Sequence, residues 1–163
     1  MHIELVPTTA DQAPLIANLY QFYAYESSDW EEEEIEADGR YYIHQEHLAR
    51  YWQEPQWSAR LILVDGFIAG FLLIERSELV GIDAREFADL FILKKYRRLG
   101  IGRALAQQVM GDGGTWLLRF YAEDELAAAF CRSVLADLPV GSRQVWPDDE
   151  PGLLSYLVNP PLH

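Results

Sequence analysis

An apolar segment, a turn with two glycines and an amphipathic segment follow one another between residues 87 and 110. Residues 87–93 predict a strand, and residues 101–110 repeat apolar side chains at helical spacing. Between them stands the sequence Arg97-Arg98-Leu99-Gly100-Ile101-Gly102. A strand that feeds through a glycine turn into an amphipathic helix is typical of a sheet covered by helices, which favours an α/β fold.

Strand and helix patterns alternate along the rest of the chain. Asp65-Gly66 separates two strand-like segments and is a strong β-hairpin signal. The acidic segment 27–39 predicts a loop or a frayed turn. The expected strands are 3–6, 60–64, 67–75, 87–93, 115–121, 143–146 and 153–158. The expected helices are 41–52, 101–110, 125–135 and a first helix, capped by Thr9, that carries Leu15, Ile16, Leu19, Phe22 and Tyr23 on one side. This order predicts a mixed α/β sheet.

Composition narrows the class of protein. The 163 residues, of which 50% are hydrophobic, fit one domain over 1–163 with a substantial core. A single cysteine, Cys131, excludes an intramolecular disulfide scaffold. The net charge of -13 argues against nucleic acid or an anionic membrane as partner. Without a recognisable signal peptide or an apolar run long enough to span a bilayer, the chain is expected to be soluble and cytoplasmic.

Basic residues are concentrated in the glycine turn and its surroundings. Five of the 13 lie there, and no acidic residue occurs between Leu90 and Gly111. Glycines let the backbone approach a ligand closely, and the free amides at a helix N-terminus attract anions. The turn therefore predicts a site for an anionic, phosphate-bearing ligand. The five residues are Lys94, Lys95, Arg97, Arg98 and Arg103.

Two nucleotide-binding motifs fit this turn poorly. The dinucleotide fingerprint requires a third glycine where Leu105 stands, and the P-loop requires a lysine and a hydroxyl residue where Arg103-Ala104 stand. A turn with solvated arginines and no ligand would explain the basic cluster, the glycines or the helix start taken singly. It explains less well why all three occur together.

Residues 90–105 resemble motif A of the GCN5-related N-acetyltransferases, whose signature is Q/R-x-x-G-x-G/A. They are similar to that family's fourth strand, loop and third helix, and the order of elements is similar over nearly the whole chain. The resemblance implies a mixed, mostly antiparallel central sheet flanked by helices. It also implies acetyl-CoA, or another acyl-CoA, as the donor. No metal is expected, because no third His or Cys is placed to complete a site with His44 and His47.

The resemblance further implies which residues hold the donor. Backbone amides from Arg98 to Ala104 would bind the pyrophosphate, and the strand Phe91 to Leu93 would hydrogen-bond the pantetheine arm. The amide of Ile92 would stabilise the oxyanion. The implied donor-binding residues are Phe91, Ile92, Leu93, Arg97, Arg98, Leu99, Gly100, Ile101, Gly102, Arg103 and Ala104.

The resemblance also implies candidate catalytic residues. Glu86 and Asp89 lie where the family's base commonly lies, and deprotonation through water is an equal alternative. Many members of the family have the pattern N-x-x-A-x-x-F-Y in the fourth helix, and its tyrosine is the general acid. In this sequence Asp124 stands at the position of the asparagine and Cys131 at that of the tyrosine. Cys131 is therefore a candidate acid, although an inert buried thiol is the more ordinary interpretation. Tyr121 and Tyr96 are further candidates.

The acceptor is left open. In the family, the first two helices and their connection wall the acceptor side, where aromatic residues beside carboxylates suit a cation. A small primary amine, a polyamine, an aminoglycoside-like compound or a protein amine would all fit. His44 and His47 are more ordinary as a helix face than as metal ligands. A non-catalytic acyl-CoA sensor and a partner-binding domain remain alternatives, as do a monomer and a homodimer. The acceptor-side residues are Tyr20, Phe22, Tyr23, Tyr25, Asp29, Trp30 and Glu31 to Glu34.

Overall fold

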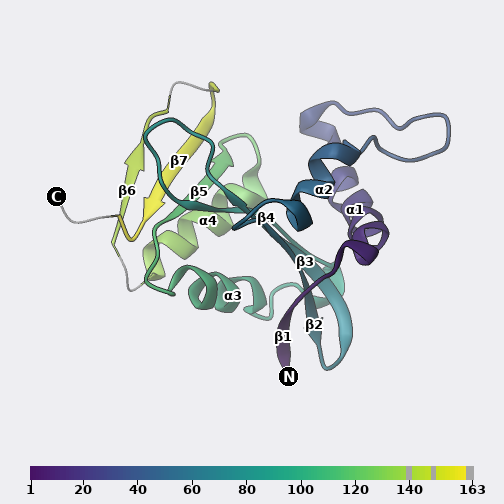
Figure 1. Ribbon diagram of the computed structural model, residues 1–163, viewed down its shortest axis with the longest axis horizontal. Coiled ribbons are helices and arrows are strands. Elements are labelled where there is room, and N and C mark those ends of the chain that lie inside the picture. The colour runs from purple at the N-terminus through teal and green to yellow at the C-terminus, as the bar shows by residue number, and fades with distance from the viewer. Residues whose placement is uncertain (139–140, 148–149, 161–163) are drawn as a thin grey trace.

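The computed structural model describes residues 1–138, 141–147 and 150–160. Within them, seven strands form one sheet in the order β1-β2-β3-β4-β5-β7-β6 (Figure 1). The strands are β1 Ile3–Pro7, β2 Ser58–Val64, β3 Phe67–Arg76, β4 Arg85–Ile92, β5 Trp116–Tyr121, β6 Ser142–Val145 and β7 Leu153–Val158. The helices are α1 Ala13–Glu31, α2 Gln45–Gln53, α3 Ile101–Met110 and α4 Glu125–Asp137, with short 3-10 turns η1 Ala10–Gln12 and η2 Lys94–Tyr96.

Neighbouring strands of this sheet run antiparallel, except that β4 and β5 are parallel. The expected mixed, mostly antiparallel sheet flanked by helices is confirmed. The hairpin is confirmed as well, because Asp65 and Gly66 join β2 to β3 with φ of 51° and 83°. Two successive positive φ angles are what a tight, right-twisted hairpin turn requires.

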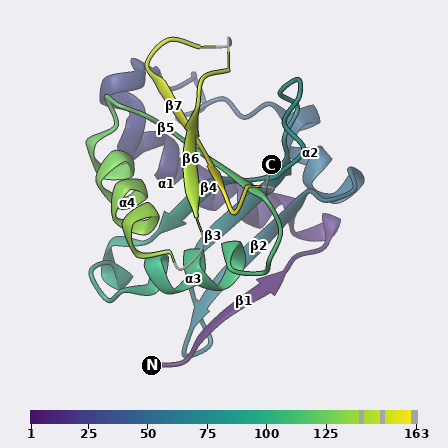
Figure 2. The same cartoon turned by 90° about the vertical axis from the view of Figure 1, so that its left-hand side faces the viewer.

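Helices cover both faces of the sheet (Figures 1 and 2). On one face, α1 and α2 pack Ile16 and Leu48 against Phe71 and Phe91 of the central strands. On the other face, α3 and α4 pack against β3, β4 and β5 in a cluster that includes Trp116. In the described ranges, no helix has the length and apolar character needed to cross a membrane.

Three expectations about the first two helices are wrong. The helix α1 continues to Glu31 through part of the expected loop, because no glycine or proline interrupts it before Glu32 turns to a φ of 56°. The helix α2 begins only at Gln45, since Tyr41 is held outside it by two hydrogen bonds between its backbone and the Gln21 side chain. Phe22, expected on the core side of α1, is 55% exposed.

The strands β4 and β5 part soon after they meet. They pair only at Arg85 with Trp116 and at Glu86 with Leu117. Beyond these residues β4 stays paired with β3 as far as Ile92, whereas β5 stays paired with β7. The sheet is therefore split between its two parallel strands, on the side where their carboxyl ends lie.

Candidate functional site

The split leaves backbone groups of β4 facing the gap. The amide of Leu93 donates to the carbonyl of Ala69 at 2.8 Å, so Leu93 faces β3. Because peptide groups alternate in direction along a strand, Ile92 and Leu90 face β5, where the described chain offers no strand to pair with them. The Ile92 carbonyl instead accepts a hydrogen bond from Arg97 Nε at 2.6 Å. This edge of β4 has the geometry to bond an extended ligand.

The N-terminus of α3 supplies a second set of backbone donors. Gly100 is its N-cap with a φ of 79°, in the left-handed region that favours glycine. The amide of Ala104 donates to the Gly100 carbonyl at 3.0 Å, which is the first bond of the helix. The amides of Ile101, Gly102 and Arg103 therefore have no carbonyl partner within α3, and they lie at its positive end. Such amides form a site for an anion.

Gly102 brings this helix end close to β4. A Cβ atom there would lie 3.0 Å from Cε2 of Phe130, 3.3 Å from a methyl carbon of Leu90 and 3.4 Å from one of Ile92. A side chain at residue 102 would therefore require either α3 or these neighbouring side chains to shift by a few tenths of an ångström. The glycine therefore keeps the free amides of α3 beside the open edge of β4.

The predicted donor-binding residues are brought together at these two places. The prediction that Phe91 and Leu93 bond the donor arm through their backbone is wrong, because both face β3, which leaves Ile92 at the open edge. Three further residues are already engaged. Arg97 pairs with Glu26 of α1 at 2.5 Å and lies over the Phe91 ring. Arg103 pairs with Asp137 of α4 at 2.7 Å. The Ala104 amide is used inside the helix. Arg98 and Leu99 are exposed in the turn. The contribution of the two paired guanidinium groups to donor binding stays a prediction.

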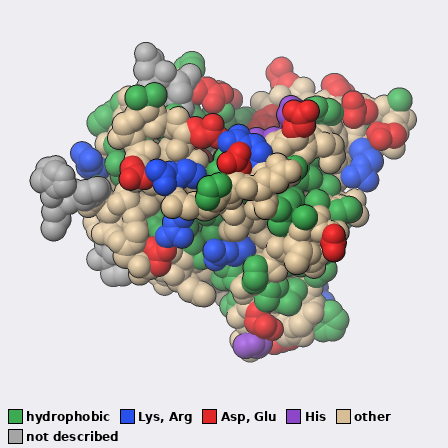
Figure 3. Space-filling model, viewed as in Figure 1, with side chains coloured by type: hydrophobic (Ala, Val, Ile, Leu, Met, Phe, Trp, Pro, Cys, Tyr) green, Lys and Arg blue, Asp and Glu red, His purple; other side chains and the backbone are tan. Residues whose placement is uncertain are grey.

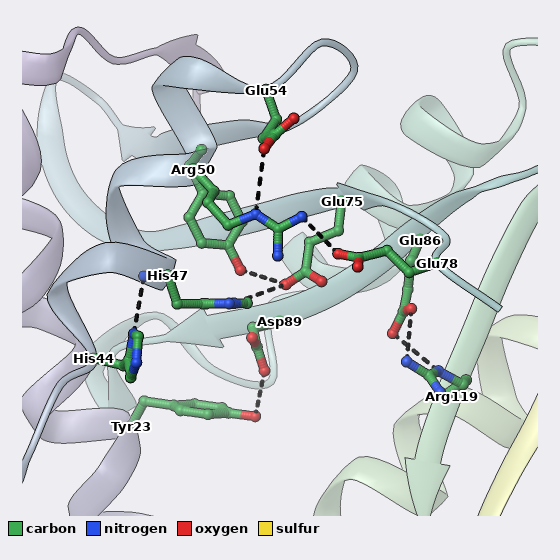
Figure 4. Close-up of polar contacts among 11 residues, drawn as sticks. Tyr23, His44, His47, Arg50, Glu54, Glu75, Glu78, Glu86, Asp89 and Arg119 are labelled. Atoms are coloured by element: carbon green, nitrogen blue, oxygen red, sulfur yellow. Dashed lines mark hydrogen bonds and ion pairs between the residues drawn. The ribbon is translucent and has the colours of Figure 1, made fainter. Parts of the chain in front are cut away.

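Three carboxylates gather on the face of β3 and β4 that α1 and α2 cover (Figure 4). Glu75 lies opposite Glu86, and Leu73 lies opposite Asp89. The register shifts between these pairs, so Ala88 is a bulge residue without an opposite partner. Side chains three residues apart would normally point to opposite faces of a strand; the bulge turns Glu86 and Asp89 to the same face.

Asp89 is held through one of its two oxygens. Tyr23 of α1 donates its hydroxyl hydrogen to Oδ1 at 2.9 Å, and no described residue bonds Oδ2. Burial, with a contribution from the charge of Glu75, raises the pKa of Asp89 to about 6, although the Tyr23 hydrogen bond and His47 act in the opposite direction. The carboxylate is thus ionised at neutral pH and has a free oxygen that can take up a proton.

Glu86 is engaged more fully. Arg119 of β5 donates to both of its oxygens, at 3.0 and 3.2 Å. Burial raises the pKa of Glu86 despite this pairing. From the sequence, Glu86 and Asp89 are equal candidates for the base. The structure places both in the site, and of the two only Asp89 has a free oxygen.

Glu75 completes the cluster from β3. The hydroxyl of Tyr51 donates to it, and His47 Nε2 lies 3.7 Å from the same oxygen. His44 is the N-cap of α2 and accepts a hydrogen bond from the His47 amide at 3.1 Å, which is a structural role. Among the described residues, no group of three or more His, Cys, Asp and Glu side chains is arranged to hold a metal ion.

The predicted acceptor side is only partly assembled. Tyr23 reaches Asp89, and the Trp30 ring contacts that of Tyr121 with centroids 5.4 Å apart, so the end of α1 meets the end of β5. Tyr25 is 69% exposed. Partial burial and the neighbouring Glu33 raise the pKa of Glu31 to about 7. Figure 3 shows acidic side chains over the connection between α1 and α2, with Lys and Arg nearer the middle of that face.

Cys131 and Asp124 have structural surroundings. Cys131 is buried in the core cluster between the sheet and α4. Burial, together with the charge of Asp124, raises the pKa of its thiol to about 12. Asp124 is the N-cap of α4 and accepts a hydrogen bond from the Ala127 amide at 3.2 Å. The acidic role of Cys131 stays a prediction, and its burial favours packing.

Comparison with known families agrees with this architecture. A family model described as the acetyltransferase (GNAT) family matches residues 19–133, which include the split between β4 and β5 and all of α3. The chain belongs to the GNAT acetyltransferase family. The resemblance of residues 90–105 to motif A is thereby confirmed as a family relationship. No curated protein matches the sequence.

Solved structures show the same fold for this GNAT protein. It is similar to an acetyltransferase from Thermus thermophilus, with 22% identity, 96% of each chain covered and a TM-score of 0.65. A GNAT-family acetyltransferase from Staphylococcus aureus has 14% identity and a TM-score of 0.64, and the match covers 98% of this chain and 100% of the Staphylococcus chain. A histone acetyltransferase HPA2 and related acetyltransferase from Corynebacterium glutamicum has 14% identity, covers 100% and 99%, and has a TM-score of 0.63.

Three residues of the site were missed by the sequence analysis. Glu75, Tyr51 and Arg119 enter it from β3, α2 and β5. A signal existed for Glu75, because it is the first charged residue after the apolar run 67–74 and so lies where a buried strand ends. Nothing local marks Tyr51 or Arg119, whose roles depend on the register of distant strands.

Proposed function

We propose that this GNAT protein transfers an acetyl group from acetyl-CoA to a primary amine of a small cationic acceptor, by direct attack within a ternary complex. The observation that carries the proposal is the split between β4 and β5 beside the N-terminus of α3. It sets an unpaired strand edge next to free amides at a positive helix end. An extended, amide-containing arm followed by a pyrophosphate matches both features.

The residues present fit that donor. The amides of Ile101, Gly102 and Arg103 would bind its pyrophosphate, and the edge of β4 at Leu90 and Ile92 would bond its arm. When bound, acetyl-CoA supplies the activated acetyl thioester. The amide of Ile92 would donate a hydrogen bond to the carbonyl oxygen as negative charge develops on it.

Asp89 is the proposed base. An amine attacks only as the free base, so its ammonium form must first give up a proton. Asp89 is ionised at neutral pH, has a free Oδ2 and lies on β4 three residues before Ile92. The neighbouring Glu75 and Glu86 make the surroundings acidic, which favours a cationic acceptor. Glu86 is a poorer base because Arg119 occupies both of its oxygens.

Calorimetric titration with acetyl-CoA tests the donor site, with desulfo-CoA as a second CoA ligand and NADH as an unrelated nucleotide. Micromolar binding of the CoA ligands alone is expected. Gly100→Glu, which places a carboxylate at the anion site, should abolish it. Gly113→Glu is the matched control, because Gly113 also has a positive φ and open space around it but follows α3. Equal binding by the two variants would refute the site.

Release of the CoA thiol in the presence of an amine panel then tests transfer. The panel contains monoamines, diamines, polyamines and lysine peptides, and turnover is expected with a small cationic amine. A sensor without catalysis is the second candidate, favoured by the buried Cys131 at the position of the family's tyrosine. It predicts acetyl-CoA binding with no turnover on any amine.

A further inference from the structure

We propose that Tyr23 is a positioning residue for Asp89: its hydroxyl fixes one carboxylate oxygen and leaves the other directed to the acceptor amine. The inference rests on the proposed function, in which Asp89 is the base. It adds a role for a residue of α1 that is 66 positions distant in the sequence.

Packing fixes the place of the Tyr23 hydroxyl. The Tyr23 ring lies edge-on to Phe71 and Phe91, with centroids 6.2 and 6.0 Å away, and tilted against Tyr20 at 5.3 Å. Phe71 and Phe91 are buried side chains of β3 and β4, the strands that carry the site. A ring held from three sides has little freedom to move its hydroxyl, so the 2.9 Å hydrogen bond to Oδ1 has one geometry.

The chemistry of the pair allows only one direction of bonding. An ionised carboxylate accepts and cannot donate, so the Tyr23 hydroxyl is the donor. The charge of Asp89, followed by burial, raises the pKa of Tyr23 far above its ordinary value. The hydroxyl therefore keeps its proton at every working pH, and it cannot be the group that removes a proton from the amine.

On Asp89, the proposed base, the proton-transfer step then has one available acceptor atom. The N–H bond of the acceptor ammonium breaks, its electron pair stays on nitrogen, and an O–H bond forms at Oδ2 of Asp89. Oδ1 is occupied by Tyr23, so the hydrogen bond selects the reacting oxygen and stabilises the ionised form that must be present beforehand. A freely rotating carboxylate would share its time among several orientations.

Other titratable groups around Asp89 also influence its pKa. They reach it from α1 and its C-terminal end, from α2, from β3 and from β4 itself. Glu75 raises the pKa of Asp89 and His47 lowers it. These groups are Tyr20, Tyr23 and Glu31, then His47 and Tyr51, then Glu75, and lastly Glu86.

Tyr23→Phe removes the hydroxyl and keeps the ring, and Tyr20→Phe is the matched control. Tyr20 stacks on the same Phe71 at 6.1 Å but donates no hydrogen bond to Asp89. Carboxyl carbon NMR, with Asp89→Asn to assign the signal, follows the titration directly. The pKa of Asp89 should rise from about 6 in the parent protein. A rise of about one pH unit is expected in Tyr23→Phe, and none in Tyr20→Phe.

The pH dependence of kcat/KM separates positioning from damage to the fold. In Tyr23→Phe the acid limb should move upward with the titration. The shifted titration alone should lower the rate relative to the parent protein by about two-fold at pH 7, and the loss due to the unfixed carboxylate should persist at pH 9. Full recovery of the rate by pH 9, or an unmoved Asp89 titration, would overturn the proposal. Absence of turnover by the parent protein would overturn the proposed function, while the NMR titration would still report on the hydrogen bond.

Discussion

The two sides of β4 are built in different ways. The proposed donor side uses backbone: the open edge at Ile92 and the free amides that begin α3, all within residues 90–104. The proposed acceptor side uses side chains, and these come from α1, α2, β3, β4 and β5. A backbone site depends on a few glycines and one helix end, whereas the carboxylate cluster depends on the relative position of five elements.

This difference indicates which substitutions each side of the proposed site can tolerate. Substituting an exposed residue in the turn leaves the amides in place, so that side should tolerate variation at Leu99. Arg98 is more restricted, because its φ of 63° lies in the left-handed region. On the acceptor side the proposed base is a single side chain, Asp89. The first half therefore fails when a glycine is lost, and the second fails when one carboxylate is lost.

The largest expected effect is the loss of rate in Asp89→Asn. Removal of a general base lowers kcat by about 10²–10⁴-fold, and acetyl-CoA affinity should stay unchanged because the donor side is separate. In the parent protein, kcat/KM should fall tenfold per pH unit below about pH 6, as Asp89 becomes protonated.

Glu86→Gln is the comparison for that variant. It removes one negative charge from the carboxylate cluster, so it should raise the KM of a cationic amine more than it lowers kcat. Steady-state kinetics over pH 5–9 distinguish the two variants. A larger fall in kcat for Glu86→Gln than for Asp89→Asn would exchange the two assignments.

The second expected effect is on stability: Asp89→Asn should stabilise the fold although it lowers activity. Folding raises the pKa of Asp89 from 3.8 to about 6, so the ionised form is less favourable in the folded state. This cost appears as the pH rises through 3.8 and is complete above about 6. Asp89→Asn should therefore stabilise the protein by roughly 1–3 kcal/mol at pH 8, with the gain disappearing near pH 3.

Asp112→Asn is the matched control for the stability measurement. Although burial opposes them, hydrogen bonds from Trp116, Gly114 and Arg85 hold the pKa of Asp112 below its ordinary value. Its stabilising contribution is therefore present at neutral pH and is lost as the pH falls through that pKa. Urea unfolding at pH 3 to 8 should give opposite signs for the two variants, and equal signs would contradict the assigned surroundings of Asp89.

The strand, turn and helix of the proposed donor side could be predicted from the sequence because their information is local. A strand, two glycines and a helix are adjacent in the chain, and the hairpin at Asp65-Gly66 fixes the register before them. The acceptor side depends on the bulge at Ala88, which turns Asp89 to the same face as Glu86, and on Tyr23 arriving from α1. Neither depends on neighbouring residues alone, so the sequence could name Glu86 and Asp89 but could not choose between them.

The third effect tests the donor side through Gly102. Gly102→Ala places a methyl group 3.0 Å from the Phe130 ring and is expected to move α3 outward from β4 by a small distance. The Kd for acetyl-CoA should rise about tenfold, while the NMR titration of Asp89 stays as in the parent protein. Gly141→Ala is the control, because open space surrounds Gly141. An unchanged Kd in Gly102→Ala would show that the close approach of α3 to β4 does not contribute to donor binding.

The smallest expected effect on activity is that of Cys131→Ala. The thiol is buried in the core and its pKa is raised to about 12, so it has little tendency to give its proton to a departing thiolate. Removing it should cost about 1 kcal/mol of unfolding free energy through lost packing and leave the pH dependence of kcat unchanged. Thermal unfolding and the pH–rate profile measure the two quantities. If instead kcat falls and the basic limb changes, Cys131 is the acid at the position of the family's tyrosine, and the chemistry of α4 has to be added to that of β4.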